Sequence, residues 1–154
     1  MHNGAGVTSS NEGLDGIAWN VVGHIYRPKL VSADAFVWHA EIPAETFVPP
    51  HVHPHQDEWI YVLSGALEVD FGFEAGNVQP HRAGAGDMVR MPKGVLHAVF
   101  NRSGADATCL FGVSPTRKLF DLFGALDGVT EPAELMRLSA LHEVDFLPPP
   151  DAEA

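Results

Sequence analysis

Two scarcities, of cysteine and of basic residues, exclude several classes of protein. Cys109 is the only cysteine in 154 residues, so no disulfide can form within the chain, which fits a reducing compartment. The 9 Lys and Arg residues stand against 20 Asp and Glu residues, and the formal net charge of -11 would repel nucleic acid and anionic membranes. No apolar run approaches the roughly 20 residues that span a bilayer, and the N-terminus lacks the pattern of a signal peptide. We expect a cytoplasmic protein that binds neither nucleic acid nor a membrane.

Turn-forming residues are plentiful, with 15 Gly and 12 Pro distributed between short apolar runs. This composition favours a turn-rich all-β structure, and the length suits one domain. Alternation of apolar residues predicts about eight short strands. The clearest of them lie at residues 35–42, 58–63, 66–73, 87–91, 97–101 and 107–113. Residues 74–85 are expected to form a loop.

Helical periodicity begins only after Pro115. Apolar residues at helical spacing predict a helix over 119–126, and Pro132 marks the first turn of a second helix that extends to about residue 141. We expect the leucine stripes of both helices to pack on the strands or in a dimer contact. The predicted organisation is a flexible N-terminal arm (1–16), a β-sandwich or barrel (17–114), helices packed on it (115–147) and a tail (148–154).

Three histidines and one glutamate stand in two short motifs. The first motif ends at Gly65 and contains His51, His53 and Glu58. The second contains Gly86, Pro92, Gly94, His97 and Asn101. Because side chains alternate along a strand, His51 and His53 point the same way, and a turn at 54–57 would let Glu58 face them. Three imidazoles and one carboxylate suit a divalent Fe, Mn, Ni, Co, Cu or Zn ion, with about two positions left for water or substrate.

The residues around these motifs have simpler interpretations. His55 is expected on a turn, His39 opposite the apolar face of its strand, and Cys109 in the core. A surface position is expected for His2, His24, His81 and His142. Four apolar residues on the same strands as the ligands would line an apolar substrate pocket, or belong to the core alone. They are Ile60, Val62, Met91 and Val99.

Both motifs resemble the two sequence motifs of the cupin superfamily. The first family motif is Gly, five residues, His-x-His, three or four residues, Glu, six residues and Gly. It is matched here except at the leading Gly, where Glu45 stands. The resemblance implies a double-stranded β-helix, the jelly-roll barrel of cupins, and implies that the metal ligands are His51, His53, Glu58 and His97. The wider pattern is similar to small single-domain cupins of the quercetinase-like kind. In the flavonol dioxygenases of the superfamily, the ligand Glu acts as a base toward the substrate hydroxyl. That role would fall to Glu58, and a homodimer is expected by the same resemblance.

The leading hypothesis is a metal-dependent oxidoreductase of the dioxygenase type, acting with O2 on a small hydroxylated or enolisable substrate. Two alternatives stay open because the cupin fold hosts many activities. One is a non-redox cyclase or isomerase that uses the metal as a Lewis acid. The other is a non-enzymatic barrel that binds a small molecule.

Overall fold

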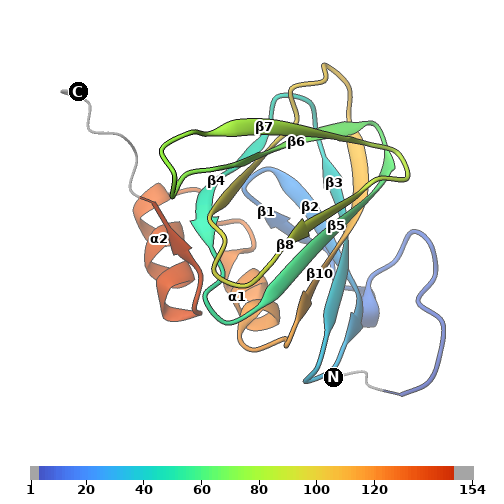
Figure 1. Cartoon of the computed structure of the whole chain (residues 1–154). Helices are drawn as coiled ribbons and strands as arrows, with labels where there is room; N and C mark the ends of the chain where they lie inside the picture. Colours follow the sequence, from blue (N-terminus) through green and yellow to red (C-terminus); the bar gives the residue numbers. More distant parts are fainter. Residues whose placement is uncertain (1–3, 148–154) are drawn as a thin grey trace.

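Two antiparallel sheets enclose the core of the computed structural model, which describes residues 4–147 (Figure 1). One sheet has the strand order β1 (Trp19–Val21), β2 (His24–Val31), β3 (Phe36–Ile42), β10 (Ala107–Ser114), β5 (Asp57–Ser64) and β8 (Met88–Met91). The other has the order β11 (Asp145–Phe146), β4 (Phe47–Val52), β9 (His97–Phe100), β6 (Ala66–Phe71) and β7 (Gln79–Gly84). This arrangement confirms the predicted all-β jelly-roll fold, the double-stranded β-helix.

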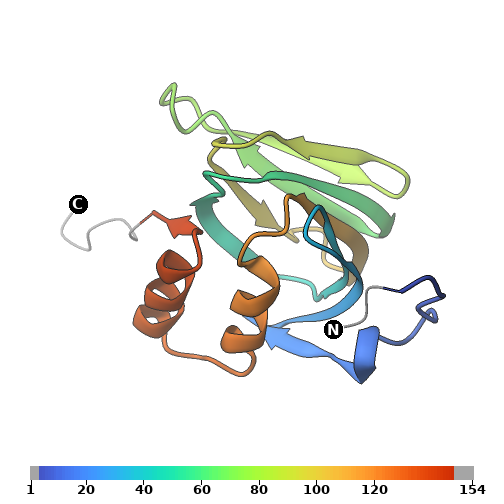
Figure 2. The ribbon, with the colours of Figure 1, turned by 90° about the horizontal axis from the view of Figure 1, so that it is seen from below.

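The two predicted helices are also confirmed, as α1 (Leu119–Leu126) and α2 (Pro132–Leu141). They lie side by side against one side of the strands (Figure 2). The apolar face of α1 is buried in the same core as the strands, and Trp38 of β3 packs edge-on against Phe123 of α1 at 4.9 Å between ring centroids. Neither helix has the length and apolar composition needed to cross a membrane.

Alternation along the central strands follows the prediction. In β3, Phe36, Trp38, Ala40 and Ile42 are buried, while His39 is among the partly exposed residues between them. Cys109 of β10 is buried in the core, as predicted. The apolar face of β3 therefore points into the space between the two sheets.

The prediction of a loop over residues 74–85 is wrong in its second half, where β7 forms. This strand is at the edge of its sheet and, among the strands of residues 4–147, pairs only with β6. Its side chains are mostly exposed and polar, so no apolar alternation marks it, and it contains Pro80. Proline is tolerated on an edge strand because one side of the strand needs no hydrogen bonds.

The prediction that His24 lies on the surface is wrong, since its side chain is fully buried. Its Nε2 lies 2.9 Å from Thr46 Oγ1, and Thr46 donates its hydroxyl proton to the Pro43 carbonyl at 2.6 Å. The Thr46 oxygen is thus free to accept from His24 Nε2–H. Nδ1 then accepts from the Tyr26 hydroxyl at 3.1 Å. Both nitrogens are satisfied in a neutral imidazole, which is why burial is tolerated.

The segment before β1 is held to β2 rather than paired as a strand. The Lys29 ammonium donates to the carbonyls of Ser9 and Glu12, each at 2.6 Å, and Thr8 donates to the Lys29 carbonyl at 2.8 Å. A single turn of 3₁₀ helix, η1 (Leu14–Gly16), follows. Residues 1–3 of the predicted arm and all of the predicted tail (148–154) lie outside the described residues, and the predicted division of the chain stays a prediction.

Candidate metal centre

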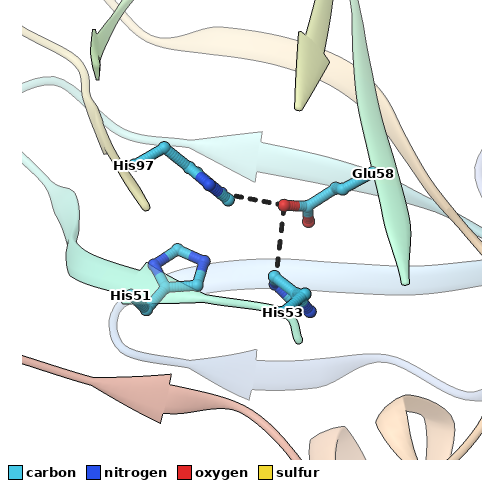
Figure 3. Close-up of side chains that lie close together, drawn as sticks. All are labelled: His51, His53, Glu58 and His97. Carbon is cyan, nitrogen blue, oxygen red and sulfur yellow. Dashed lines mark ion pairs between the residues drawn. The ribbon is translucent and has the colours of Figure 1, made fainter. Parts of the chain in front are cut away.

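Four side chains from separate places in the sequence converge inside the barrel (Figure 3). They are His51, His53, Glu58 and His97, the four that the sequence motifs single out. One ligand atom of each lies within 4.8 Å of those of the others. His97 is 1% exposed, His51 and His53 are 5% exposed and Glu58 is 6% exposed, so the cluster is shielded from bulk water.

The sheet topology explains this convergence. Strands β4 and β9 are neighbours, and their register places His51 directly opposite His97. After His53 the chain leaves that sheet through a turn and enters β5 in the opposite sheet. Glu58 therefore faces the three imidazoles from across the barrel (Figure 3). A single turn between the sheets allows one short motif to supply ligands from both.

The turn before His97 is fastened to the turn that carries His53. The Gly94 amide donates to the His53 carbonyl at 3.1 Å, and the Lys93 amide donates to the Asp57 carboxylate at 2.9 Å. Gly94 has a φ of +82°, in the left-handed region that glycine adopts without a steric penalty. The glycine of the second motif thus helps to position a ligand without touching the cluster.

Other motif positions are structural as well. Asn101 is fully buried and donates to the carbonyls of Ile42 and Ala105, both at 2.8 Å. A Cβ on Gly65 would lie 2.8 Å from the Asp106 carbonyl oxygen, so only glycine fits there. Glu45, which replaces the leading Gly of the family motif, has a φ of +68°. The turn therefore keeps the left-handed backbone conformation despite the substitution.

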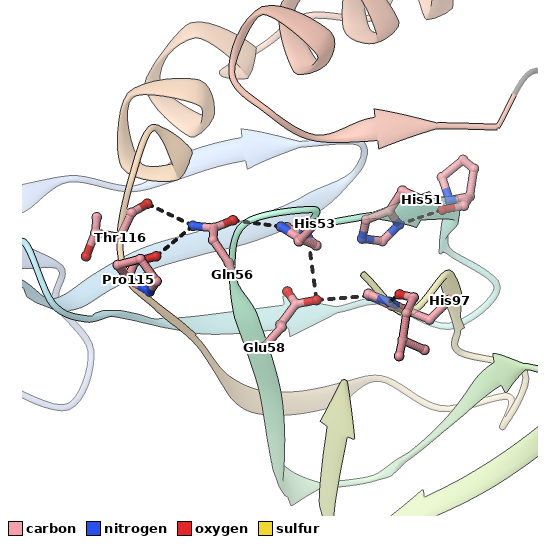
Figure 4. Close-up of polar contacts among 9 residues, drawn as sticks. His51, His53, Gln56, Glu58, His97, Pro115 and Thr116 are labelled. Carbon is pink, nitrogen blue, oxygen red and sulfur yellow. Dashed lines mark hydrogen bonds and ion pairs between the residues drawn. The ribbon is translucent and has the colours of Figure 1, made fainter. Parts of the chain in front are cut away.

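Two of the imidazoles are oriented by backbone carbonyl groups (Figure 4). His51 Nδ1 lies 2.8 Å from the Pro49 carbonyl oxygen, and His97 Nδ1 lies 3.0 Å from the Val95 carbonyl oxygen. A carbonyl oxygen only accepts hydrogen bonds, so each Nδ1 carries the proton. In the neutral imidazoles, each Nε2 then has a free lone pair.

The third imidazole is oriented by a side chain that is itself anchored. Gln56 donates its amide protons to the carbonyls of Pro115, at 3.1 Å, and Thr116, at 2.8 Å (Figure 4). Its Oε1 must therefore face His53, whose Nδ1 lies 2.9 Å away and donates to it. His53 Nε2 is left for a ligand bond in the same way. Such outer contacts fix the tautomer and the ring orientation of metal-binding histidines.

Burial and the neighbouring side chains shift the pKa values of three members of the cluster. Burial, together with the positive charges that His97 and His53 would carry, lowers the pKa of His51 to about 3 and keeps it neutral. Burial alone would raise the pKa of Glu58, but the three imidazoles outweigh burial and lower it to about 2. Burial likewise opposes the charge on His97, and the Glu58 carboxylate outweighs it and raises the pKa of His97.

The cluster fits a metal ion by its donor set and by two atoms that lack partners. His97 Nε2 and Glu58 Oε1 lie 2.9 Å apart, yet neither has a hydrogen-bond partner of acceptable geometry. His53 Nε2 lies 3.5 Å from the same oxygen. A metal ion between these atoms, or a proton on His97 Nε2, would satisfy both of them. We interpret the cluster as a candidate site for one metal ion.

A cavity of about 50 Å³ adjoins the cluster. Its walls come from both sheets and from both helices, with apolar side chains such as Val48, Phe111, Leu122 and Leu135. Pockets for drug-sized molecules usually measure roughly 300–1,000 Å³, so this cavity is small. The arrangement places the His and Glu cluster at the wall of a small, mostly apolar cavity.

The four residues predicted to line a pocket are all buried, but they are placed differently. Val99 lines the cavity. Ile60, Val62 and Met91 are packed in the core and are not part of its wall. His55 is about half exposed, with its Nε2 3.9 Å from the Glu143 carboxylate, and it lies outside the cluster.

Several residues that matter to the site were missed by sequence reasoning. Gln56 stands between two ligands, but its role depends on carbonyl groups far away in the chain, at a separation of 59 and 60 residues. Trp38 and Ser139 line the cavity from β3 and α2, and no motif marks them. Leu135 and Ser139 are four residues apart on α2, a spacing that places them on one helix face.

Comparisons with known proteins agree on the family. Residues 38–113 match the family model of the cupin domain. Germin-like protein 9-3 of Oryza sativa subsp. japonica is 37% identical over 68 residues, which make up 44% of this chain and 32% of that protein. Protein SchB of Streptomyces halstedii is 32% identical over 75 residues, 49% of this chain and 51% of SchB. The chain spans about a third of the length of the rice relative and about half of SchB.

Solved structures share the fold at low sequence identity. KdgF from Halomonas sp. superposes with a TM-score of 0.60 at 22% identity, covering 73% of this chain and 99% of that one. TT1209 from Thermus thermophilus gives a TM-score of 0.53 at 23% identity, covering 60% and 83%. An oxalate oxidase structure gives 0.51 at 19% identity, covering 61% and 52%. Together with the family model and the two motifs, these similarities show that the chain belongs to the cupin superfamily.

Proposed function

We propose that this protein is a metal-dependent cupin enzyme, an oxidoreductase of the dioxygenase type that acts on a small hydroxylated or enolisable organic compound. The observation that supports it is the buried convergence of three imidazoles and a carboxylate, with each Nδ1 bound to an acceptor. Four ligands leave about two positions free on a six-coordinate ion. A bound redox-active ion would supply electron transfer to O2, whereas zinc would supply Lewis acidity alone.

The ligand charges favour a substrate with one anionic oxygen. Three neutral imidazoles and one carboxylate carry a single negative charge, so a divalent ion in this site keeps one positive charge. The apolar walls exclude water and strengthen attraction to an enolate or phenolate oxygen. An enolisable compound whose remaining atoms are largely apolar matches both features of the cavity.

Glu58 supports the proposal first as a ligand. With its pKa lowered to about 2 it is ionised at neutral pH, as a metal ligand must be. The same low pKa makes it a weak base. The catalytic role that the family resemblance implies for Glu58, as a base toward the substrate, is therefore a separate hypothesis. Loss of turnover in Glu58→Ala, with turnover retained in Glu58→Asp, would be consistent with either role and would place Glu58 in the site.

Elemental analysis of the purified protein tests the proposal directly. We expect about one transition-metal ion per chain in the wild type and loss of the ion in His97→Ala. His81→Ala is the matched control, because His81 is exposed on β7 and lies outside the cluster. Equal metal content in wild type and His97→Ala would contradict the metal site.

The identity of the metal and the need for O2 decide between the remaining functions. A redox-active ion with O2 consumption in a screen of flavonols and related enols is the expected result. Zinc, with turnover that needs no O2, would favour the cyclase or isomerase alternative. Small-molecule binding without any metal, even after reconstitution, would favour the non-enzymatic binder. The homodimer and the cytoplasmic location stay predictions, to be checked by sedimentation and by cell fractionation.

A further inference from the structure

The His and Glu cluster is closed off from solvent by the protein itself. Its four members are between 1% and 6% exposed, and the cavity beside them measures about 50 Å³. One water molecule needs about 10–15 Å³ of such space, so the cavity holds a few water molecules. An organic compound can reach the cluster only if part of the cavity wall moves.

The cavity wall is least firmly held where α2 and β11 form it. Within α2, Ser139 is the one buried residue of ten, whereas α1 buries four of its eight residues in the core. Strand β11 has two residues and, among the described strands, pairs only with β4. This part of the chain supplies Leu135, Val144 and Phe146 to the wall. Because elements with few buried contacts open most readily, α2 and β11 are the part of the wall that is able to move.

Strand β11 lies directly against one member of the cluster. Phe146 is the cross-strand partner of His51, and the centroids of their two rings are 5.1 Å apart. The Leu147 amide donates to the Pro50 carbonyl at 3.0 Å. Figure 2 shows α2 and β11 together at one edge of the molecule, with β11 beside β4. An outward movement of α2 and β11 would therefore uncover the cluster at His51.

One ion pair fastens this part of the wall to the loop between β10 and α1. Arg117 of that loop donates twice to the carboxylate of Glu143, from Nε at 2.9 Å and from Nη2 at 2.6 Å. Glu143 lies in the turn between α2 and β11. Both residues have a left-handed backbone conformation, with a φ of +46° for Arg117 and +68° for Glu143. Such strained residues persist only where the surrounding contacts hold them, and they are common in ligand clamps and switch regions.

We propose that α2, β11 and the turn between them form a lid over the cluster, and that the ion pair of Arg117 with Glu143 is its latch. The lid turns about the three residues that follow Gly128, whose φ is +76° and whose amide is held by the Asn20 carbonyl at 3.0 Å. Opening admits an organic compound that the closed cavity does not hold. The lid rests on the proposed function only in that the cluster is taken as the place where this compound binds.

Thiol labelling of the metal-free protein measures the opening of the lid. Ser139→Cys introduces a thiol on the buried side of α2, and Cys109, buried in β10, reports unfolding of the whole barrel in the same sample. A chromogenic disulfide reagent reacts with each thiol only when it is exposed. We expect the introduced thiol to react at least about 100-fold faster than Cys109, because local opening costs less free energy than global unfolding.

Loss of the latch should make the lid open more often. In the Ser139→Cys background, Glu143→Gln should raise the labelling rate of the introduced thiol about two- to fivefold, the effect of removing one exposed ion pair. Glu134→Gln is the matched control. Glu134 makes an equivalent double contact with Arg137 inside α2, so its loss leaves the attachment of α2 to the barrel unchanged.

Entry of a probe compound tests whether the lid controls access to the cluster. Catechol, which is much larger than a few water molecules, is mixed rapidly with the cobalt-loaded protein, and cobalt absorbance gives the rates of binding and release. Glu143→Gln should raise both rates about two- to fivefold and leave Kd unchanged, because a lid that opens more often speeds entry and exit alike. A residue that merely contacts the bound compound would change Kd.

The outcomes separate the lid from the metal centre. Equal labelling rates for the introduced thiol and Cys109 would overturn the lid, because the wall would then open only with the whole barrel. Equal increases in Glu143→Gln and Glu134→Gln would also overturn it, since α2 would then unfold rather than swing outward. Catechol rates that are the same in wild type and Glu143→Gln would refute the control of access. A protein that labels as expected but binds no cobalt would support the lid and contradict the metal-dependent function.

Discussion

His24 makes the stability of the metal-free protein depend on pH in a way that one substitution can isolate. The side chain is fully buried on β2, and burial lowers its pKa from 6.5 to about 4. In the unfolded chain His24 takes up a proton as the pH falls below its ordinary pKa, while in the folded protein it stays neutral. His24 therefore contributes fully to the unfolding free energy above pH 6.5, and this contribution is lost progressively as the pH falls toward 4.

The pKa difference sets the size of this effect. One pKa unit corresponds to about 1.4 kcal/mol, so the complete loss is about 3 kcal/mol and the loss between pH 7 and pH 5 is about 2 kcal/mol. His51 acts in the same direction, because its pKa is lowered to about 3. The two effects add in the wild type. Replacing His24 by Gln removes its share alone, since an amide can donate and accept hydrogen bonds without titrating.

Urea denaturation at the two pH values, in the presence of a chelator, measures the effect. We expect the drop in unfolding free energy from pH 7 to pH 5 to be smaller in His24→Gln than in the wild type by about 2 kcal/mol. His81→Gln, an exposed site on β7, should change the drop by less than about 0.5 kcal/mol. Equal drops in wild type and His24→Gln would refute the reasoning, because folded His24 would then bind a proton.

Three further substitutions test other parts of the structure. Gln56→Ala should weaken metal binding about 10- to 100-fold without changing the stoichiometry, because His53 loses the acceptor that orients it. Competition with a chromophoric chelator measures the affinity, and an unchanged affinity would rule out the orienting role. Ser139→Ala should raise the unfolding free energy by about 1 kcal/mol, since an unpartnered buried hydroxyl is replaced by a better helix former. A lower melting temperature in that variant would show that the hydroxyl has a partner. Glu45→Gly should stabilise the protein by up to about 1 kcal/mol, because it relieves the strain of a left-handed backbone conformation at φ +68°. A lower unfolding free energy in urea denaturation would indicate that the Glu45 side chain makes a compensating contact.

Local patterns in the sequence are sufficient to predict the fold class and the members of the metal cluster. Both depend on alternation along strands and on the turn residues between them. Gly94 adopts a positive φ without a steric penalty, and its turn leads into the strand that carries His97. Because a strand repeats every two residues, parity also shows that Ile60 and Val62 share the inward face with Glu58.

Strand parity shows which side chains point inward, but not how far along the barrel they lie. For this reason the sequence could not show which of the inward-facing residues line the cavity. Ile60 and Val62 point inward, but they lie further along β5 than Glu58 and pack in the core away from the cavity. The edge strand β7 was missed for a related reason, since a strand exposed on most of its surface has no apolar alternation to detect.

The residues that surround the cluster are brought there by tertiary packing alone. The burial of His24 and the anchoring of Gln56 on the backbone of Pro115 and Thr116 both arise from contacts between segments far apart in the chain. Such contacts depend on how the sheets and helices pack, and packing leaves no periodic signal in the sequence. The four members of the candidate metal cluster could be identified from local spacing, whereas the cavity beside them is a property of the assembled barrel and helices.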